Sequence, residues 1–410
     1  MSILLILLLL GQGISCGILE IESHEGCEHK PMWPPHIIEI ISYLTVFMIC
    51  NLANATGIGG GGMLVPLLVI VMDFPAHNAI PLSKSIILGG AIVSVIMSIR
   101  TRPMPLDLKI VSILQPTTLL GTAVGVWLNK LFPDWLILML LTSTLVYVIY
   151  KNFTKAFKLY RAETVKIAKI QEIKEKNQES SGLTSKESTP DESEDFKQAT
   201  FDGFPWKSTI LITLNYISVL LFALLKGGSG MESIIGIEQC SASYWTLALI
   251  YTIYSIIMTG FAYFFIAKDL SWSLPKTICY TIISFIGGIG SGMLGLGGGV
   301  IIGPLMLDIG LTPEVTAASS SLIVMFTSSS TSLQFYLGNV LDIEYAAVMF
   351  VISMLASVTG ITMVSKLIKK YQRPSIIVFI LGGVTTLSAI LLPGYSYYVM
   401  SKNDIFHKVC

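Results

Sequence analysis

Two runs of glycine are the residues of this chain most able to do chemistry, because each run adjoins a short apolar segment. One run stands in "TGIGGGGMLVPLLVIVMDF" and the other in "GLGGGVIIGPLM". Glycine frees the backbone from helical geometry, and a helix that begins just after it presents unpaired N–H groups and the positive end of its dipole. Such a helix start can bind an anion without side chains. The candidate residues are Gly59, Gly60, Gly61, Gly62, Gly297, Gly298 and Gly299.

Polar side chains within apolar segments form the second candidate group. Lys84 lies about a turn and a half into such a segment and is flanked by serines, and an intramembrane cation beside hydroxyls suits an anionic ligand. The alternatives are a snorkelling lysine or one paired with Asp73, and serines that serve close helix packing. The candidate side chains are Asn54, Ser83, Lys84, Ser85, Ser319, Ser320 and Ser321.

Residue patterns for other chemistry are missing from the sequence. There is no Ser/His/Asp constellation and no HExxH motif, so we expect no enzyme activity and no cofactor. The GxGxxG match at Gly290–Gly295 follows a membrane-length apolar segment rather than a soluble βαβ unit, which excludes a dinucleotide site. His77 lies near the first glycine run, at the expected start of a helix. The two alternatives for this residue are a role in proton coupling and a structural role at the helix start.

The elements that position these residues are membrane helices. The chain has 410 residues, of which 53% are hydrophobic and 13% charged, with a mean hydropathy of +0.72. This composition is too apolar for a soluble domain and predicts an all-α polytopic membrane protein with about 10–12 hydrophobic segments. The segments lie near 37–56, 63–74, 78–99, 108–129, 134–151, 207–225, 244–267, 277–294, 299–311, 315–336, 345–366 and 375–396.

Two of these segments, 63–74 and 299–311, are too short to cross a bilayer and are predicted to be half-helices. Non-helical backbone occurs at membrane depth only where protein or a water-filled cavity pairs with its N–H and C=O groups. A broken helix is therefore expected to line a cavity or a binding site. Any single glycine run could instead serve close helix packing. A glycine run followed by a too-short segment in both halves favours an anion site.

An internal repeat relates the two halves of the chain. A constant offset aligns Gly59–Gly61 with Gly297–Gly299, and the register then holds without a gap for three prolines or serines further on. The matched pairs are Pro66 with Pro304, Pro75 with Pro313 and Ser83 with Ser321; after a three-residue deletion Asp107 matches Asp342 and Gly125 matches Gly360. Two repeats on either side of a hydrophilic loop are the organisation of a transporter.

Charge distribution predicts the orientation of the repeats. Residues 1–16 resemble a signal peptide, with an uncleaved anchor as the alternative, so the segment 17–36 is expected outside. The basic loop around Arg100–Lys109 and the loop 151–206 then fall on the cytoplasmic side, in agreement with the positive-inside tendency. The loop equivalent to the first of these, "LGNVLDIE", is acidic and falls outside. The two repeats are therefore predicted to be inverted.

The domain organisation follows from these assignments. We expect a signal peptide, an extracytoplasmic segment, a first repeat, a charged and partly disordered cytoplasmic loop, a linking pair of spans, a second repeat and a tail. Their ranges are 1–16, 17–36, 37–151, 152–206, 207–276, 277–396 and 397–410.

The paired motifs resemble those of the sulfite exporter TauE/SafE family of membrane permeases. The resemblance rests on "GIGGGGMLVPLL" with "FPAHNAIPLSK" in the first half and "GLGGGVIIGPLM" with "LTPEVTAASSSLIV" in the second. It implies secondary transport of sulfite or small organosulfonates, coupled to protons, through two related halves. The signal-like start and the long charged central loop depart from that pattern and look like eukaryotic elaborations.

The expected partners are therefore a small anionic substrate and the lipid bilayer, with no nucleic acid; homo-oligomers remain open. Plasma membrane and endomembrane of a eukaryote fit the sequence equally. Two alternative functions also remain: an anion channel built from the same broken helices, and a non-transporting scaffold or receptor whose working part is the central loop.

Overall fold

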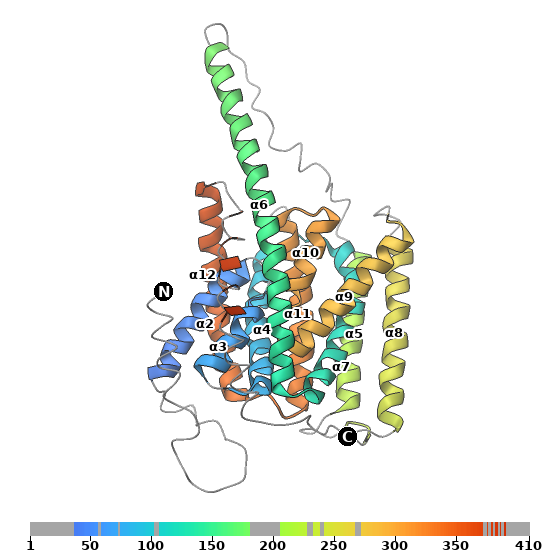
Figure 1. Ribbon diagram of the computed structural model, residues 1–410. Coiled ribbons are helices and arrows are strands. Elements are labelled where there is room, and N and C mark those ends of the chain that lie inside the picture. The colour runs from blue at the N-terminus through green and yellow to red at the C-terminus, as the bar shows by residue number, and fades with distance from the viewer. Residues whose placement is uncertain are drawn as a thin grey trace.

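The structure is a computed structural model of the whole chain (Figure 1). It describes residues 37–371 apart from 56–58, 73, 102–105, 181–205, 228–232, 238–241 and 267–271, and beyond them only the positions 375, 379, 382, 383, 386, 389 and 390. The predicted signal peptide 1–16, the segment 17–36 and the tail 397–410 lie outside the described residues. They stay predictions.

Every regular element of the described residues is a helix. The elements are α2 (Ile37–Ala55), α3 (Gly61–Val71), α4 (Ala76–Arg100), α5 (Leu108–Leu131), α6 (Asp134–Ser180), α7 (Trp206–Lys226), α8 (Ala242–Ile266), α9 (Leu274–Leu294), α10 (Gly299–Ile309), α11 (Pro313–Leu337) and α12 (Ile343–Tyr371). Seven of these are long and apolar enough to cross a membrane: α4, α5, the first part of α6, α7, α8, α9 and α12. The predicted all-α polytopic architecture is confirmed.

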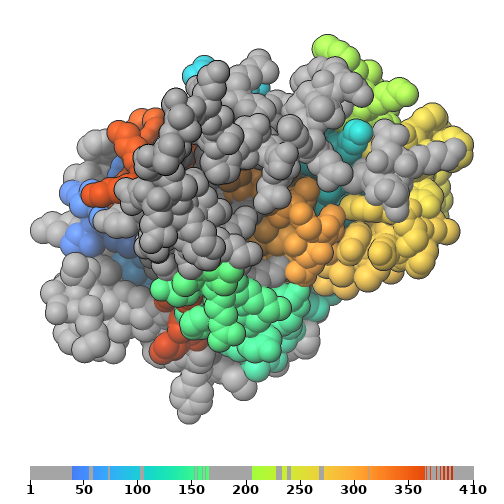
Figure 2. Space-filling view, turned by 90° about the horizontal axis from the view of Figure 1, so that it is seen from above, coloured from blue at the N-terminus to red at the C-terminus, as the bar shows by residue number. Residues whose placement is uncertain are grey.

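The peripheral helices show where lipid contacts the protein. Figure 2, viewed from above, shows α8 at one edge of the molecule and α2 near the opposite edge. Large apolar side chains of α7 and α8 are exposed along their length, for example Leu214, Leu221, Ile256 and Phe264. Exposed apolar faces of this size on a helix suit hydrocarbon rather than water.

The glycine runs interrupt the helical path in both halves. The chain leaves α2 at Ala55 and starts α3 at Gly61, and it leaves α9 at Leu294 and starts α10 at Gly299. Gly59, Gly60 and Gly295 have φ values of 82°, 67° and 69°, in the left-handed region that glycine tolerates best. We call residues 59–60 the first interruption and residues 295–298 the second interruption.

The helices that follow the interruptions are short. Both α3 and α10 contain 11 residues, which corresponds to about 16 Å, roughly half of a hydrocarbon core of about 30 Å. Each has a proline inside it, Pro66 or Pro304. These are the half-helices predicted from the sequence, with α3 beginning two residues earlier than expected.

The long helix α6 shows how the half-helices are directed. His77, shortly after α3, is 3.3 Å from the carboxylate of Asp134 at the start of α6, whereas Asp308 near the end of α10 is 3.8 Å from Nζ of Lys151. Lys151 lies 17 residues beyond Asp134 in α6, about 25 Å along the helix axis. The half-helices therefore extend toward opposite ends of the bundle, as Figure 1 also shows.

The element bounds support the internal repeat. One offset, 238 residues, relates both ends of α3 to both ends of α10, and an offset of 235 residues relates the start of α5 to the start of α12. The aspartates that cap the amino-terminal ends of α5 and α12 correspond as well. Asp107 accepts hydrogen bonds from the backbone of Lys109 and Ile110 at 3.0 and 3.1 Å. Asp342 accepts from Glu344 and Tyr345 at 3.1 and 3.3 Å.

The two halves are interlocked by close helix packing. Helix α5 packs along α9, and α12 packs along α2, so each half contributes a helix to the other. A Cβ built on Gly125 would overlap the carbonyl oxygen of Ile289, and a Cβ on Gly360 would overlap that of Asn51. These two contacts are equivalent under the repeat offsets. The absence of a side chain lets each helix pair approach at backbone distance.

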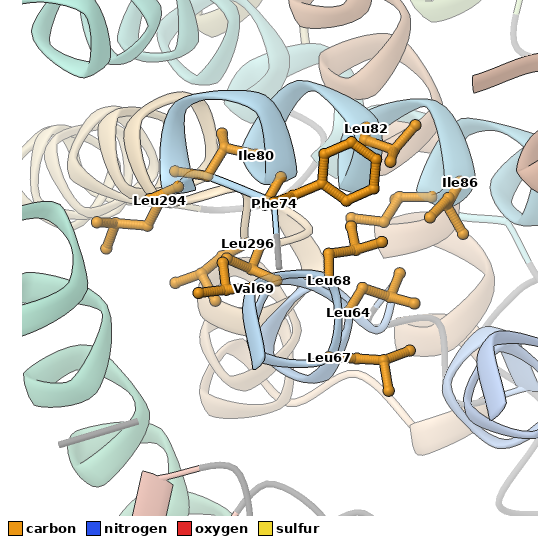
Figure 3. Close-up of a cluster of buried hydrophobic side chains, with 14 of the residues drawn as sticks. Leu64, Leu67, Leu68, Val69, Phe74, Ile80, Leu82, Ile86, Leu294 and Leu296 are labelled. Atoms are coloured by element: carbon orange, nitrogen blue, oxygen red, sulfur yellow. The ribbon is translucent and has the colours of Figure 1, made fainter. Parts of the chain in front are cut away.

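The apolar core surrounds the first half-helix. Figure 3 shows Leu64 and Leu68 of α3, Phe74, and Ile80 and Ile86 of α4 gathered there, with Leu294 and Leu296 from the second half beside them. Tight packing of large side chains fixes the position of α3 against α4. The second interruption is thus held against the first half of the chain.

Candidate functional site

The two interruptions are in backbone contact. A Cβ built on Gly61 would lie 2.6 Å from the amide nitrogen of Gly297 and 2.9 Å from Cα of Leu296, and it would overlap the carbonyl oxygen of Gly295. A Cβ on Gly59 would lie 3.4 Å from Cα of Gly297. Only glycine allows this approach. The amino-terminal ends of α3 and α10 therefore meet inside the bundle.

Lys84 joins the first half of the chain to the second interruption. Its Nζ donates to Oγ of Ser291, in α9, and to the carbonyl oxygen of Leu296, each at 2.7 Å. The side chain is fully buried, with 0% of its surface exposed. Both partners are uncharged, so neither compensates the charge of an ammonium group. An anion at this place would gain a charge-assisted hydrogen bond from Lys84.

Hydroxyl groups complete the surroundings of the α10 start. A Cβ built on Gly298 would lie 3.4 Å from Oγ1 of Thr327 and 3.7 Å from Oγ of Ser291. Ser328 is fully buried, and its hydroxyl has no hydrogen-bond partner among the described residues. Val324, one helical turn before Ser328, lies 3.2 Å from a Cβ built on Gly59, which places this face of α11 against both interruptions.

Three of these residues, Ser291, Thr327 and Ser328, are not among the candidate residues selected from the sequence. The sequence signal was available: Ser291 stands within "GSGMLG", and the other two stand in the hydroxyl-rich stretch two turns after Ser319–Ser321. The local sequence does not distinguish these hydroxyls from those of serines and threonines that pack between helices. The arrangement of α9, α10 and α11 shows that they lie near the start of α10.

Among the described residues, the two interruptions differ in the polarity of their surroundings. Under the 238-residue offset, Lys84 corresponds to Leu322, and Ser291 corresponds to Ala53. The correspondence holds in space, because a Cβ on Gly60 would lie 2.8 Å from the Ala53 side chain. The start of α3 thus has an apolar lining where the start of α10 has hydroxyls and a cation. We therefore place the candidate anion site at the start of α10, formed by Gly297–Gly299, Lys84, Ser291, Thr327 and Ser328.

The predicted serines occupy different places. Ser83 donates to the carbonyl oxygens of Ile80, at 2.8 Å, and Gly295, at 3.3 Å, so it lies at the second interruption. Ser85 lines a shallow surface depression with Tyr336 and Phe350, away from the interruptions. The hydroxyl of Ser319 accepts from the backbone of Asp107 at 2.9 Å. Ser320 and Ser321 donate to the carbonyl oxygen of Ala317.

Asn54 holds helices together. Its amide nitrogen donates to Oγ of Ser357, at 2.7 Å, and of Ser353, at 3.4 Å, both in α12. A Cβ built on Gly90 of α4 would overlap the Asn54 side chain. The residue thus fills the junction of α2, α4 and α12, and its donors are directed at serines of α12.

Two further sequence hypotheses concern residues near the first glycine run. His77 pairs with Asp134 where α4 and α6 begin, an arrangement that fits helix entry as well as proton exchange. Asp73, the alternative partner of Lys84, lies outside the described residues. Among the residues that the structure describes, no three His, Cys, Asp or Glu side chains come together as a metal site would require.

Comparison with known proteins identifies the family. The family model described as sulfite exporter TauE/SafE matches residues 43–189 and 213–392. Sulfite exporter TauE/SafE family protein 2 of Arabidopsis thaliana is 30% identical over 389 residues, covering 87% of this chain and 82% of the relative. Family protein 5 of the same plant is 28% identical over 429 residues, covering 95% and 94%.

The comparison with solved structures gives no match. The family match spans both halves of the chain and includes both interruptions. Members of this family are membrane transporters rather than enzymes. The chain belongs to the sulfite exporter TauE/SafE family.

Proposed function

We propose that this protein is a secondary transporter of sulfite or small organosulfonate anions, coupled to protons, and that the anion binds at the start of α10. The observation that carries the proposal is Lys84, a fully buried lysine whose Nζ has, among the described residues, only the uncharged partners Ser291 and Leu296. A cation held without a carboxylate at the positive end of a half-helix is an environment that favours an anion.

The residues of the site have separate roles in this proposal. Lys84 supplies the charge and exchanges the carbonyl oxygen of Leu296 for an oxygen of the anion, which its flexible stem permits. The backbone N–H groups of Gly298 and Gly299 donate to the other oxygens, since those of Val300 and Ile301 already donate to the carbonyl oxygens of Gly297 and Gly298. Ser291, Thr327 and Ser328 add uncharged donors, so the anion loses its hydration shell without being held too tightly to leave.

The contact between the interruptions supports a transporter over an open channel. Gly61 and Gly297 are packed backbone to backbone, so the two helix starts leave no gap between them at this contact. Movement of one half against the other would expose the site to one side at a time. If the repeats are inverted as predicted, the state open to one side of the membrane and the state open to the other side have similar structures with the roles of the two halves exchanged.

The test compares sulfite flux into proteoliposomes for the wild type, Lys84→Met and Lys109→Met. Methionine keeps the length of the Lys84 side chain and removes its charge. Loss of a charge-assisted hydrogen bond of about 1.5–3 kcal/mol predicts a fall in flux of roughly tenfold to a hundredfold. Lys109 is exposed at the start of α5, so its variant serves as the control and keeps wild-type flux.

The outcome that removes Lys84 from the site is equal flux in the wild type and Lys84→Met. The same liposomes test coupling. A secondary transporter driven by protons accumulates sulfite against its gradient and loses this accumulation when an ionophore dissipates the proton gradient, whereas a channel conducts the anion only down its own electrochemical gradient.

A further inference from the structure

Two carboxamide side chains in the membrane interior have no hydrogen-bond partner among the residues that the structure describes. Gln115 of α5 is 0% exposed and Asn215 of α7 is 1% exposed. In each residue both the amide nitrogen and the amide oxygen lack a partner among the described residues. Buried polar groups are almost always paired, and an unpaired carboxamide in hydrocarbon is strongly unfavourable. A bound ligand that pairs with these two groups would remove this unfavourable free energy.

Packing places both side chains at one junction. Val111 of α5 and Ile212 of α7 belong to one buried cluster, and Leu119 of α5 and Val219 of α7 belong to another. Gln115 lies one helical turn after Val111 and one before Leu119. Asn215 lies on the same face of α7 as Ile212 and Val219, between them. Since α5 and α7 pack together, the helical register places the two carboxamides at corresponding levels of this helix pair.

Helix α11 closes this junction on its third side. Phe326 packs against both of those clusters. The hydroxyl of Tyr216, next to Asn215 in the chain, is 2.7 Å from that of Ser329. Thr327, next to Phe326, faces the start of α10. The carboxamides and the anion site therefore lie against adjacent faces of one helix.

We propose that Gln115 and Asn215 form a second, uncharged binding position for the transported oxyanion, adjoining the Lys84 site. Each carboxamide offers two N–H donors and one oxygen acceptor, which suits an anion with several oxygens and one ionisable hydroxyl. Neutral donors hold an anion more weakly than Lys84 does, as a position occupied in transit requires. This inference rests on the proposed function.

The test uses the full-length protein with Gln115→Met, Asn215→Leu and the double variant, beside Gln334→Met as control. Sulfite flux into proteoliposomes is measured together with the thermal unfolding midpoint in detergent without sulfite. We expect each single variant to lower flux about tenfold and the double variant to lower it further. We also expect unfolding midpoints equal to or above that of the wild type, because removing an unpaired buried polar group is not destabilising.

The control separates this role from an ordinary buried amide. The amide nitrogen of Gln334 donates to Oγ of Ser330 at 3.2 Å, so Gln334→Met loses a hydrogen bond and is expected to keep wild-type flux. Wild-type flux in the double variant overturns the second position alone. A lowered unfolding midpoint in either single variant also overturns it, because the carboxamide then has a structural partner. No sulfite flux in the wild type overturns both this inference and the proposed function.

Discussion

Lys84 has no exposed surface, and its Nζ has no charged partner within the part of the chain that the structure describes. Its equivalent in the second half, Leu322, is also buried but cannot bind an anion. A single charge therefore makes two otherwise related half-helix starts chemically different.

Gly61 is the residue on which the contact between the interruptions depends most. We expect Gly61→Ala to lower the free energy of unfolding by about 3 kcal/mol, because the added Cβ meets backbone atoms of Gly295, Leu296 and Gly297 that cannot move aside. Thermal unfolding in detergent measures the change.

Gly303→Ala is the matched control for Gly61→Ala. Gly303 lies inside α10, where an added Cβ meets nothing within 4 Å. The alanine is expected to stabilise the helix by up to about 1 kcal/mol. Similar unfolding midpoints for the two variants would show that the interruptions are not held in contact.

At the scale of elements, α5 and α9 pack along each other, and glycines on both helices permit their close approach. Gly121 and Gly125 of α5 face Gly288 and Gly292 of α9, and a Cβ on any of these four would meet backbone of the other helix. In a bilayer such small residues drive association, since lipid is as apolar as the helix surface. Because the second interruption directly follows α9, the packing of α9 against α5 helps to fix its position.

Two glycines of α9 allow a direct test of this packing. Gly292→Ala would place a Cβ against the carbonyl oxygen of Thr122, so we expect a loss of about 1–3 kcal/mol in the free energy of unfolding. Gly290→Ala meets only the Cδ1 atom of Ile301, at 3.4 Å, which is the end of a flexible side chain. Its unfolding midpoint should stay near the wild type. Equal losses in both variants would contradict the helix pairing.

At the scale of the whole molecule, the half-helices extend in opposite directions, and each half lends a helix to the other. This arrangement is what an inverted repeat would produce, because a two-fold axis in the membrane plane exchanges both the ends of the bundle and the paired helices. Charge in the loops then decides which end faces the cytoplasm.

Cysteine labelling tests the inversion with a matched pair of positions. Lys109 and Glu344 are exposed and equivalent under the 235-residue offset. In a background without native cysteines, Lys109→Cys should react with a membrane-impermeant maleimide from the cytoplasmic side and Glu344→Cys from the opposite side. Labelling of both from one side would rule out inverted repeats.

The sequence by itself determined the element types and the presence of half-helices. Apolar segment length separates a span from a half-span, and glycine runs mark broken helices, because both signals are local to the chain. The depth of Lys84 in an apolar segment is local too. These features were therefore available before any contact was known, as was the repeat offset that relates α3 to α10.

Only the tertiary structure decided which helix faces meet. Lys84 reaches Leu296, 212 residues away in the chain, and no local pattern encodes that pairing. For the same reason the sequence did not show that the side chain of Asn54 contacts Ser357 of α12 or that the hydroxyl of Ser319 accepts from the backbone of Asp107. Helical periodicity tells which residues share a face, but the partner of that face depends on how all the helices pack at once.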